Sequence, residues 1–238
     1  MTPGKGVLYL IPVLLGPSKA SDVLPGATLD VIRRLRAFVV EDAKSARQFL
    51  KTAGYSHSLQ DTRFEILNEH TRGNTVDALL APLLLGQDVG LMSDAGCPGV
   101  ADPGEPLVRR ALDAGVRVVP LVGPCSIILA LMASGMNGQR FCFHGYLPVN
   151  AAQRARAIRT LEADSENATQ IFIETPYRSE AMFQALLDEC RPDTRVSLAA
   201  DLTLDNEFLQ TRSVADWKRH RPALSRRPVV FLVYRGTA

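Results

Sequence analysis

The stretch Ser93–Gly104 is the part of the sequence whose residue types point most directly to chemistry. Its residues, SDAGCPGVADPG, include three glycines, two prolines and two aspartates. Glycine allows a backbone to approach a ligand closely, and proline holds a loop in one shape. The stretch follows an apolar run, Val89–Met92, and precedes a helix that we expect to open at Pro106. It is therefore a candidate ligand-binding loop, and an ordinary rigid loop between a strand and a helix is the alternative.

Three ionisable side chains are candidates for a general base, which would accept a proton from a reacting group. Asp102 lies in the glycine- and proline-rich stretch, Glu41 follows a second apolar run, and His70 stands beside Glu69. Two of them have a structural alternative. Asp42, next to Glu41, suits the N-cap of a helix, and His70 suits a loop contact. We keep Asp102, Glu41 and His70 as candidates and assign no catalytic base.

Several familiar sites are missing from the sequence. There is no Walker A phosphate loop, no GxSxG motif and no GxGxxG after the first predicted strand. The cysteines form no CxxC pair and the histidines lack metal-ligand spacing, so we predict no metal site. We expect the cysteines to be reduced thiols. They are Cys97, Cys125, Cys142 and Cys190.

The composition is that of a soluble globular protein. Hydrophobic residues make up 46% and charged residues 22%, and 27 Lys and Arg against 25 Asp and Glu give a net charge of +2. This balance does not mark a dedicated nucleic-acid or membrane binder. Local basic clusters allow either a solvated face or contact with RNA phosphates. The clusters are Arg154, Arg156 and Arg159, Lys218–Arg221, and Arg226–Arg227.

We expect a cytoplasmic protein without membrane association. No charged segment followed by an apolar one opens the chain, and no apolar stretch reaches the roughly 18 residues of a membrane span.

The first half of the chain alternates apolar runs with amphipathic segments. Continuous apolar runs indicate strands buried on both faces, and a period of about 3.6 residues indicates helices between them. This order predicts a mostly parallel sheet with helices on both faces. Within the third of these helices, Pro82 predicts a kink or a break. The predicted strands are Val7–Ile11, Ala37–Val40, Phe64–Leu67, Val89–Met92 and Val116–Leu121, and the predicted helices are Leu29–Leu35, Asp42–Ala53, Thr75–Leu85, Pro106–Ala114 and Ser126–Ser134.

The second half predicts a mixed sheet. The run Glu207–Arg212 has no helix before it, so we expect antiparallel pairing there. A small-residue linker at Met136–Gly138 suggests two α/β domains, residues 1–136 and 137–238. The other predicted strands are Phe141–Tyr146, Thr169–Ile173, Arg195–Ala200 and Val229–Tyr234, and the predicted helices are Ala151–Leu161 and Tyr177–Cys190.

The chain resembles the tetrapyrrole methylase superfamily, the class III S-adenosylmethionine-dependent methyltransferases. It is most similar to the branch that 2′-O-methylates a cytidine of small-subunit ribosomal RNA. The most specific segment is Ser93–Gly104, and the resemblance covers nearly the whole chain in order. The other segments are Leu8–Pro12, Glu41–Asp42 with Ser45–Arg47, Asn68–His70, Pro120–Ser126, Glu174–Arg178 and Pro228–Tyr234.

The resemblance implies a methyl-donor site in the cleft between two α/β domains, formed largely by backbone. It implies S-adenosylmethionine as the cofactor, a homodimer, and RNA or a ribosomal subunit as the substrate. The residues that it places at the donor are Pro12, Asp94, Ala95, Gly96, Val100, Ser126, Ile127, Tyr177, Ala200 and Val229.

One segment departs from that branch. The branch usually carries Pro-Thr-Pro-Ile-Gly-Asn-Leu in its first loop, and this chain has Pro12–Ser18, PVLLGPS, with two polar groups fewer. The alternatives are therefore a methyltransferase that acts on a tetrapyrrole or another small molecule, and a protein that binds S-adenosylmethionine without catalysis.

Overall fold

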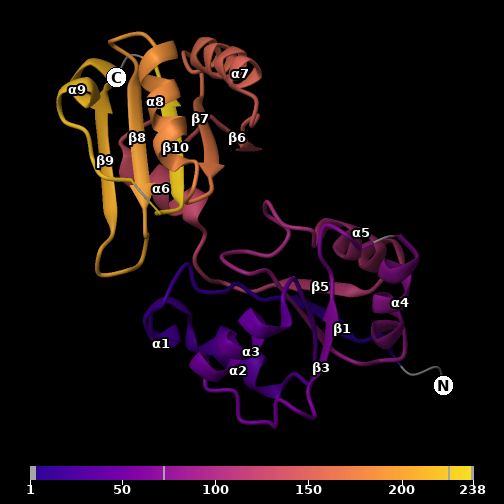
Figure 1. The fold of residues 1–238 in the computed structure, drawn as a ribbon. Helices are drawn as coiled ribbons and strands as arrows, with labels where there is room; N and C mark the ends of the chain where they lie inside the picture. The colour runs from indigo at the N-terminus through magenta and orange to yellow at the C-terminus, as the bar shows by residue number, and fades with distance from the viewer. Residues whose placement is uncertain (1–3, 72, 225, 237–238) are drawn as a thin grey trace. The chain divides into compact units, whose positions relative to one another are not determined.

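The computed structural model describes residues 4–71, 73–224 and 226–236, and the chain divides into two compact units (Figure 1). They are Met1–Cys125 and Ser126–Ala238. The division lies before the helix α6 (Ser126–Ser134), whereas the sequence suggested a linker after it, at Met136. The reason is packing, because α6 contacts three strands of the second unit, and Thr211 donates a 2.7 Å hydrogen bond to the carbonyl of Ser134.

The first unit has a five-stranded parallel sheet in the order β3-β2-β4-β1-β5, with every pair of neighbours parallel. The central strands β1 and β4 pair with Leu8 opposite Val89. The sequence-based expectation of a mostly parallel sheet is confirmed. The strands are β1 (Val7–Leu10), β2 (Ala37–Val40), β3 (Arg63–Ile66), β4 (Val89–Met92) and β5 (Arg117–Pro120).

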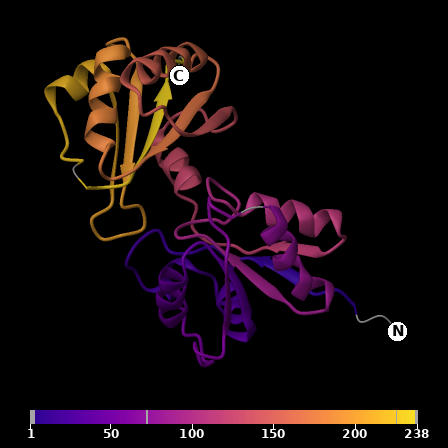
Figure 2. The same ribbon diagram turned by 45° about the vertical axis from the view of Figure 1, so that its right-hand side comes forward.

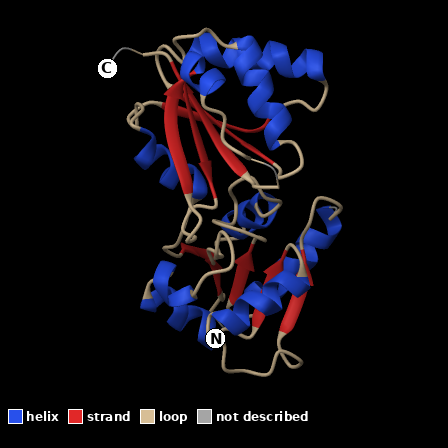
Figure 3. Ribbon diagram, turned by 60° about the vertical axis from the view of Figure 1, so that its left-hand side comes forward, coloured by secondary structure: helices blue, strands red, loops and turns tan. Residues whose placement is uncertain are grey.

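Two separate hydrophobic clusters cover the two faces of this sheet, because successive residues of a strand point to opposite faces. In β2, Phe38 and Val40 belong to the cluster under α1, α2 and α3, whereas Ala37 and Val39 belong to the cluster under α4 and α5. Figure 3 shows the helices that accompany each sheet. The helices are α1 (Ala20–Val23), α2 (Gly26–Arg34), α3 (Ala43–Thr52), α4 (Gly73–Leu84) and α5 (Glu105–Asp113).

Local signals explain where helix α3 begins and ends. Asp42 caps α3, because its carboxylate accepts hydrogen bonds from the backbone N–H of Lys44 at 3.0 Å and of Ser45 at 2.8 Å. Gly54 follows α3 with a φ of 72°, which is the left-handed conformation that ends many helices. The break expected at Pro82 does not occur, since α4 continues to Leu84.

The second unit has a mixed five-stranded sheet in the order β6-β7-β10-β8-β9 (Figure 2). β6 and β7 are parallel, while β10 is antiparallel to both of its neighbours, and β8 and β9 are antiparallel as expected. Its strands are β6 (Phe141–Tyr146), β7 (Thr169–Glu174), β8 (Arg195–Ala200), β9 (Phe208–Ser213) and β10 (Val229–Tyr234), and its remaining helices are α7 (Ala151–Asp164), α8 (Ser179–Glu189) and α9 (Val214–Arg219).

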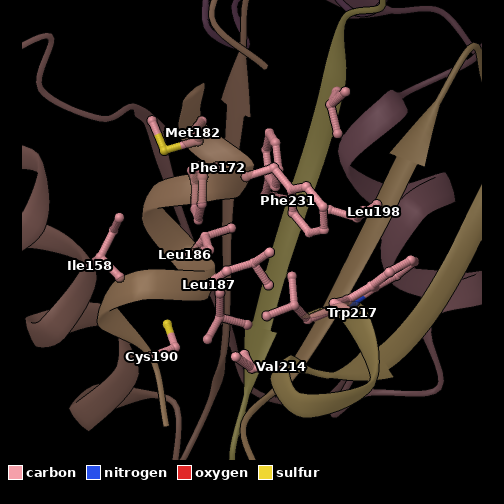
Figure 4. Packing of buried hydrophobic residues seen from close by; sticks show 14 of the residues in the cluster. Ile158, Phe172, Met182, Leu186, Leu187, Cys190, Leu198, Val214, Trp217 and Phe231 are labelled. Atoms are coloured by element: carbon pink, nitrogen blue, oxygen red, sulfur yellow. The ribbon is translucent and has the colours of Figure 1, made fainter. Parts of the chain in front are cut away.

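Aromatic side chains lie in the core of the second unit (Figure 4). Phe172 and Phe231 stack across β7 and β10 with ring centroids 5.2 Å apart. Trp217 is 1% exposed, meets Phe183 edge-on, and donates its indole N–H to the carbonyl of Val196 at 2.9 Å. The tryptophan therefore packs α9 onto the sheet as a core residue.

Candidate functional site

The loops that follow β1 and β4 are joined to each other by their backbones. The N–H of Val13 donates to the carbonyl of Gly96 at 2.8 Å, and the N–H of Gly96 donates to the carbonyl of Val13 at 3.1 Å. The chain leaves β1 toward β2 and leaves β4 toward β5, in opposite directions along the sheet. In open α/β sheets such a reversal of direction is where ligands bind. The two loops therefore form the most favourable ligand site of the first unit.

A third loop, which follows β5, packs against the first two. A β-carbon built on Gly123 would lie 2.3 Å from Cγ of Pro12, so only glycine allows this approach. The thiol of Cys97 lies 3.4 Å from the carbonyl oxygen of Pro124. A hydrogen bond with Cys125, together with burial, raises the pKa of the Cys97 thiol. Cys97 is therefore a protonated thiol that ties two loops together.

Asp102 organises the loop of residues 93–104. Its carboxylate accepts hydrogen bonds from the backbone N–H of Gly99, at 2.9 and 2.8 Å to its two oxygens, and from the N–H of Gly104 at 2.7 Å. Within this loop Gly96 has a φ of 72° and Ala101 a φ of 57°. The carboxylate of Asp102 is thus engaged in holding a tightly turned backbone, which argues against its use as a general base.

Glu41 is the candidate base whose surroundings fit that role best. It follows β2, next to β4 in the sheet, and its Oε2 accepts the backbone N–H of Asp94 at 3.2 Å. Partial burial raises the pKa of Glu41 above its ordinary value of 4.5, the Asp94 N–H opposes that rise, and the negative charges of Asp94, Asp102 and Glu69 add to it. A carboxylate with a raised pKa is a better proton acceptor at neutral pH.

Asp94 is the second carboxylate at this edge of the sheet. Burial raises its pKa, the charge of Asp42 raises it further, and a hydrogen bond with Ser45 opposes both. The pair Glu41 and Asp94 makes the edge strongly negative at neutral pH. A cationic ligand suits it better than a phosphate does.

His70 lies in a different setting. Its side chain is 83% exposed and its ring nitrogen Nε2 is 3.6 Å from the carboxylate of Glu69. The backbone N–H of His70 donates to Asn68 at 3.0 Å, within a turn after β3. These contacts are those of a surface turn.

A pocket of about 650 Å³ opens beside these groups, between the loop after β1, helix α3 and Asp94–Ala95. Val13, Leu14 and Phe49 line it with apolar surface. Its charged lining comes from Lys19 and Asp94. Its neutral polar lining comes from Ser18, whose hydroxyl oxygen is buried without a hydrogen-bond partner, and from Ser45, Gln48 and Thr52 on α3. The mixed lining suits a flat polar ring that stacks on carbon and forms hydrogen bonds at its edge.

Sequence reasoning missed the pocket residues of α3. A signal for them exists, because Ser45, Gln48 and Thr52 repeat at three- and four-residue spacing beside the buried Phe49. They form the polar border of the helix's buried face.

The residues expected at the methyl donor divide between the two units. Pro12, Asp94, Ala95, Gly96 and Val100 belong to the joined loops of the first unit, and Val100 is 42% exposed, which argues against simple core packing. The others, Ser126, Ile127, Tyr177, Ala200 and Val229, belong to the second unit.

Within the second unit these residues lie in two kinds of place. Tyr177 is 92% exposed in the turn before α8, while Ala200 and Val229 are buried partners in the β8–β10 register. Ser126 and Ile127 open helix α6. An exposed tyrosine and the first turn of a helix are ordinary places for a ligand to bind. Ala200 and Val229 are buried, and they lie where β8 ends and β10 begins.

Comparison with known proteins identifies the family of this chain. The model of the family "Tetrapyrrole (Corrin/Porphyrin) Methylases" matches residues 10–216. The chain belongs to this family. As a tetrapyrrole methylase family member it is an S-adenosylmethionine-dependent methyltransferase.

Its curated relatives include proteins named "Ribosomal RNA small subunit methyltransferase I". The one from Vibrio cholerae is 36% identical over 213 residues, which cover 90% of this chain and 70% of the relative. The one from Escherichia coli O157:H7 is 35% identical, with 89% and 71% covered. The one from Haemophilus influenzae is 31% identical, with 98% and 80% covered.

Solved structures of the family share the fold. The methyltransferase CobJ superposes with a TM-score of 0.62 at 17% identity, covering 98% of this chain and 94% of CobJ. Uroporphyrin-III-C-methyltransferase from Thermus thermophilus gives a TM-score of 0.58 at 18% identity, covering 96% and 92%. The expected pair of α/β domains, one parallel and one mixed, is confirmed by this likeness.

The residues of the first unit fit S-adenosylmethionine. The donor carries a positive sulfonium and ammonium, and the loop edge carries the carboxylates of Glu41 and Asp94. Ala95 and Gly99 are small and exposed, and a β-carbon on Gly99 would meet nothing within 4 Å, so a ligand can lie directly against this backbone. Among the residues described, no group of three or more metal-ligating side chains occurs, and no helix is long and apolar enough to cross a membrane.

Proposed function

We propose that this protein transfers the methyl group of S-adenosylmethionine to a ribose 2′-hydroxyl of small-subunit ribosomal RNA. The observation that carries the proposal is the pair of joined loops, where Glu41 and Asp94 lie together beside a pocket of about 650 Å³. The relatives named as ribosomal RNA small subunit methyltransferases support the choice of acceptor.

We further propose that the ten residues named above hold the donor. In the first unit, the backbone of Ala95 and Gly96 contacts it, Asp94 accepts hydrogen bonds from its polar end, and Pro12 and Val100 cover its apolar surface. In the second unit the contacts come from Ser126, Ile127, Tyr177, Ala200 and Val229. The exposure of Asp94, Ala95 and Val100 in the joined loops supports this assignment for the first unit.

The chemistry needs alignment and one proton acceptor. The donor supplies an electrophilic methyl group on a sulfonium, and transfer is an in-line displacement in which the hydroxyl oxygen forms a bond to carbon as the carbon–sulfur bond breaks. Glu41 accepts the hydroxyl proton, because its raised pKa makes it a stronger base than an ordinary carboxylate. Asp94 fixes Glu41 through its backbone N–H, and Asp102 fixes the loop that carries Asp94.

We propose in addition that the protein works in the cytoplasm as a homodimer. The second unit exposes apolar side chains that a monomer gains nothing by exposing, with Met132 74% and Ile128 41% exposed on α6 and Phe141 43% exposed on the edge strand β6. Sedimentation at micromolar concentration tests the dimer, which is refuted by a single 26.0 kDa species.

The acceptor is tested directly with labelled donor. Purified protein is incubated with methyl-labelled S-adenosylmethionine and unmodified small-subunit ribosomal RNA, small subunits, or a porphyrinogen. We expect label in RNA, in a nucleoside resistant to alkaline cleavage because its 2′-oxygen is methylated. Label in the porphyrinogen alone would replace RNA with a small-molecule acceptor. Donor binding without methyl transfer to any of the three acceptors would indicate a protein that binds S-adenosylmethionine without catalysis.

A further inference from the structure

Helix α3 lies between two hollows of the first unit. One is the pocket lined by Ser45 and Gln48. The other, of about 520 Å³, is lined by Arg47 and Lys51 of α3 together with residues 58–60. At about 100° per residue, Lys51 lies only about 60° around the helix from Gln48. The basic face therefore adjoins the pocket face.

The charged side chains of α3 are all positive. The helix sequence, AKSARQFLKT, contains three basic residues and no acidic one. Hydrogen bonds from Ser45 lower the pKa of the capping carboxylate of Asp42, and the nearby Lys44 lowers it further. Arg47 and Lys51 have no carboxylate within ion-pair distance in the part of the chain that the structure describes, and the guanidinium of Arg47 stacks 4.7 Å from the centre of the Phe64 ring. Both cations are therefore without a compensating carboxylate, and the ring of Phe64 positions the guanidinium of Arg47.

The basic clusters that stand out in the sequence differ in this respect. In the second unit Arg159 pairs with Glu189, and Arg219 pairs with Asp216. Arg227 pairs with Asp201 at 2.5 Å. The other basic residues of these clusters have no carboxylate within ion-pair distance among the described residues, so the clusters are compensated only in part, and the adjoining pocket is what distinguishes Arg47 and Lys51.

We propose that Arg47 and Lys51 of α3 bind backbone phosphates of the RNA, next to the nucleoside that enters the pocket lined by Ser45 and Gln48. This inference rests on the proposed function, since it names the surface on which that RNA lies. Enzymes that modify a nucleotide take it out of its stack and hold it in a pocket. The phosphates on either side then require cations at the rim, and guanidinium and ammonium groups supply them.

The matched pair of variants is Arg47→Gln with Lys51→Gln, and Arg156→Gln with Lys218→Gln. Each removes two exposed positive charges, the second pair from α7 and α9 of the second unit. The probe is unmodified small-subunit ribosomal RNA transcribed in vitro, and affinity is measured across a series of salt concentrations. We expect the α3 variant to lose about tenfold or more in RNA affinity at low salt, and the slope of log affinity against log salt to flatten by about 1.4, or about 0.7 for each lost phosphate contact.

Two further measurements keep the test interpretable. Binding of S-adenosylhomocysteine and the melting temperature should match the wild type in both variants, which shows that fold and donor site are intact. Vesicles containing phosphatidylglycerol should bind no better to the wild type than to the α3 variant.

The outcomes separate the two proposals. If the wild type methylates RNA and the α3 variant keeps its affinity and salt slope, or if the second-unit variant loses as much, the docking proposal is overturned and the function stands. If the wild type binds the donor and neither binds nor methylates RNA, the function itself fails. Preferred binding of the α3 face to vesicles would assign it to an anionic surface and overturn the RNA assignment.

Discussion

The backbone N–H of Asp94 donates a 3.2 Å hydrogen bond to the carboxylate of Glu41, and so links the carboxyl ends of the neighbouring strands β4 and β2. The link fixes a half-buried carboxylate at the edge where the joined loops meet. It also makes the two residues separable by experiment, because the donor of the bond is a backbone group that side-chain substitution does not remove.

Glu41→Gln should slow methyl transfer while leaving the donor site intact. A glutamine keeps the acceptor oxygen for the Asp94 N–H and loses the ability to take a proton. We expect kcat to fall by about 100-fold or more, which is the usual contribution of a general base. Affinity for S-adenosylhomocysteine should change little. Wild-type kcat should decline in acid as Glu41 becomes protonated, with a midpoint above 4.5, because burial raises its pKa. Full activity of the glutamine variant would remove Glu41 from the mechanism.

Asp102→Ala should weaken donor binding without acting on proton transfer. The change removes the acceptor of the Gly99 and Gly104 N–H groups, and hydrogen bonds to a charged group contribute about 1.5–3 kcal/mol each. We expect at least about a tenfold loss of S-adenosylhomocysteine affinity by calorimetry. The residual activity should still decline in acid, with its midpoint at a lower pH, because the charge of Asp102 no longer raises the pKa of Glu41. Loss of the decline in acid, together with normal affinity, would indicate that Asp102 is the base.

Gly96→Val should abolish donor binding and leave the protein folded. Gly96 has a φ of 72°, a conformation that costs other residues roughly 1–2 kcal/mol, and a β-carbon there would lie 3.4 Å from Cδ2 of Leu15. The neighbouring Cys97→Ser is the control, since a hydroxyl can donate to the Pro124 carbonyl as the thiol does. Wild-type affinity in the valine variant would show that this loop does not bind the donor.

Arg178→Met should destabilise the second unit, and adding Glu174→Met should restore much of the loss. The side chain of Glu174 is fully buried, and its main charged partner is Arg178 at 2.5 Å. Removing one member of a buried pair costs about 3–5 kcal/mol, whereas replacing both with apolar groups is often neutral. Urea denaturation of the single and double variants measures this. Additive losses in the double variant would mean that the ion pair is not the origin of the effect.

The sequence was sufficient to predict the bounds of strands that are buried along nearly their whole length. Ala37–Val40, Val89–Met92 and Val229–Tyr234 have the predicted bounds, because a strand covered on both faces must be apolar throughout and ends where polar residues begin. The edge strands β3 and β9 were placed one residue away, since their partial exposure leaves the end residue ambiguous, whereas the edge strand β6 has the predicted bounds.

Short helices escaped prediction for a different reason. α1 has four residues, no side-chain cap and a single buried residue, Ala20, so no periodic pattern can form. Ser213 caps α9, because its hydroxyl accepts the N–H of Asp216, and this serine three residues before an aspartate was a usable signal.

Composition located the candidate loop, and the structure distinguishes the two carboxylates near it. Glycine and proline content located the loop of residues 93–104, yet it could not separate Asp102 from Glu41, because both are carboxylates near the same strand ends. What separates them is the direction of nearby N–H groups. Asp102 receives two of them from its own loop, at 2.9 Å or less, whereas Glu41 receives one from a neighbouring strand's loop, at 3.2 Å.

The two hydrogen bonds between Val13 and Gly96 involve no side-chain atom. Substitutions of the side chains of Leu14, Leu15 or Ser18 therefore leave these two bonds to the loop that we propose binds the methyl donor in place. The first loop of this chain, PVLLGPS, differs from the more polar loop that the resemblance led us to expect, and the two backbone bonds do not depend on that difference. Enzymes built on this frame can acquire new acceptors by drift in one loop while inheriting the donor chemistry unchanged from the other.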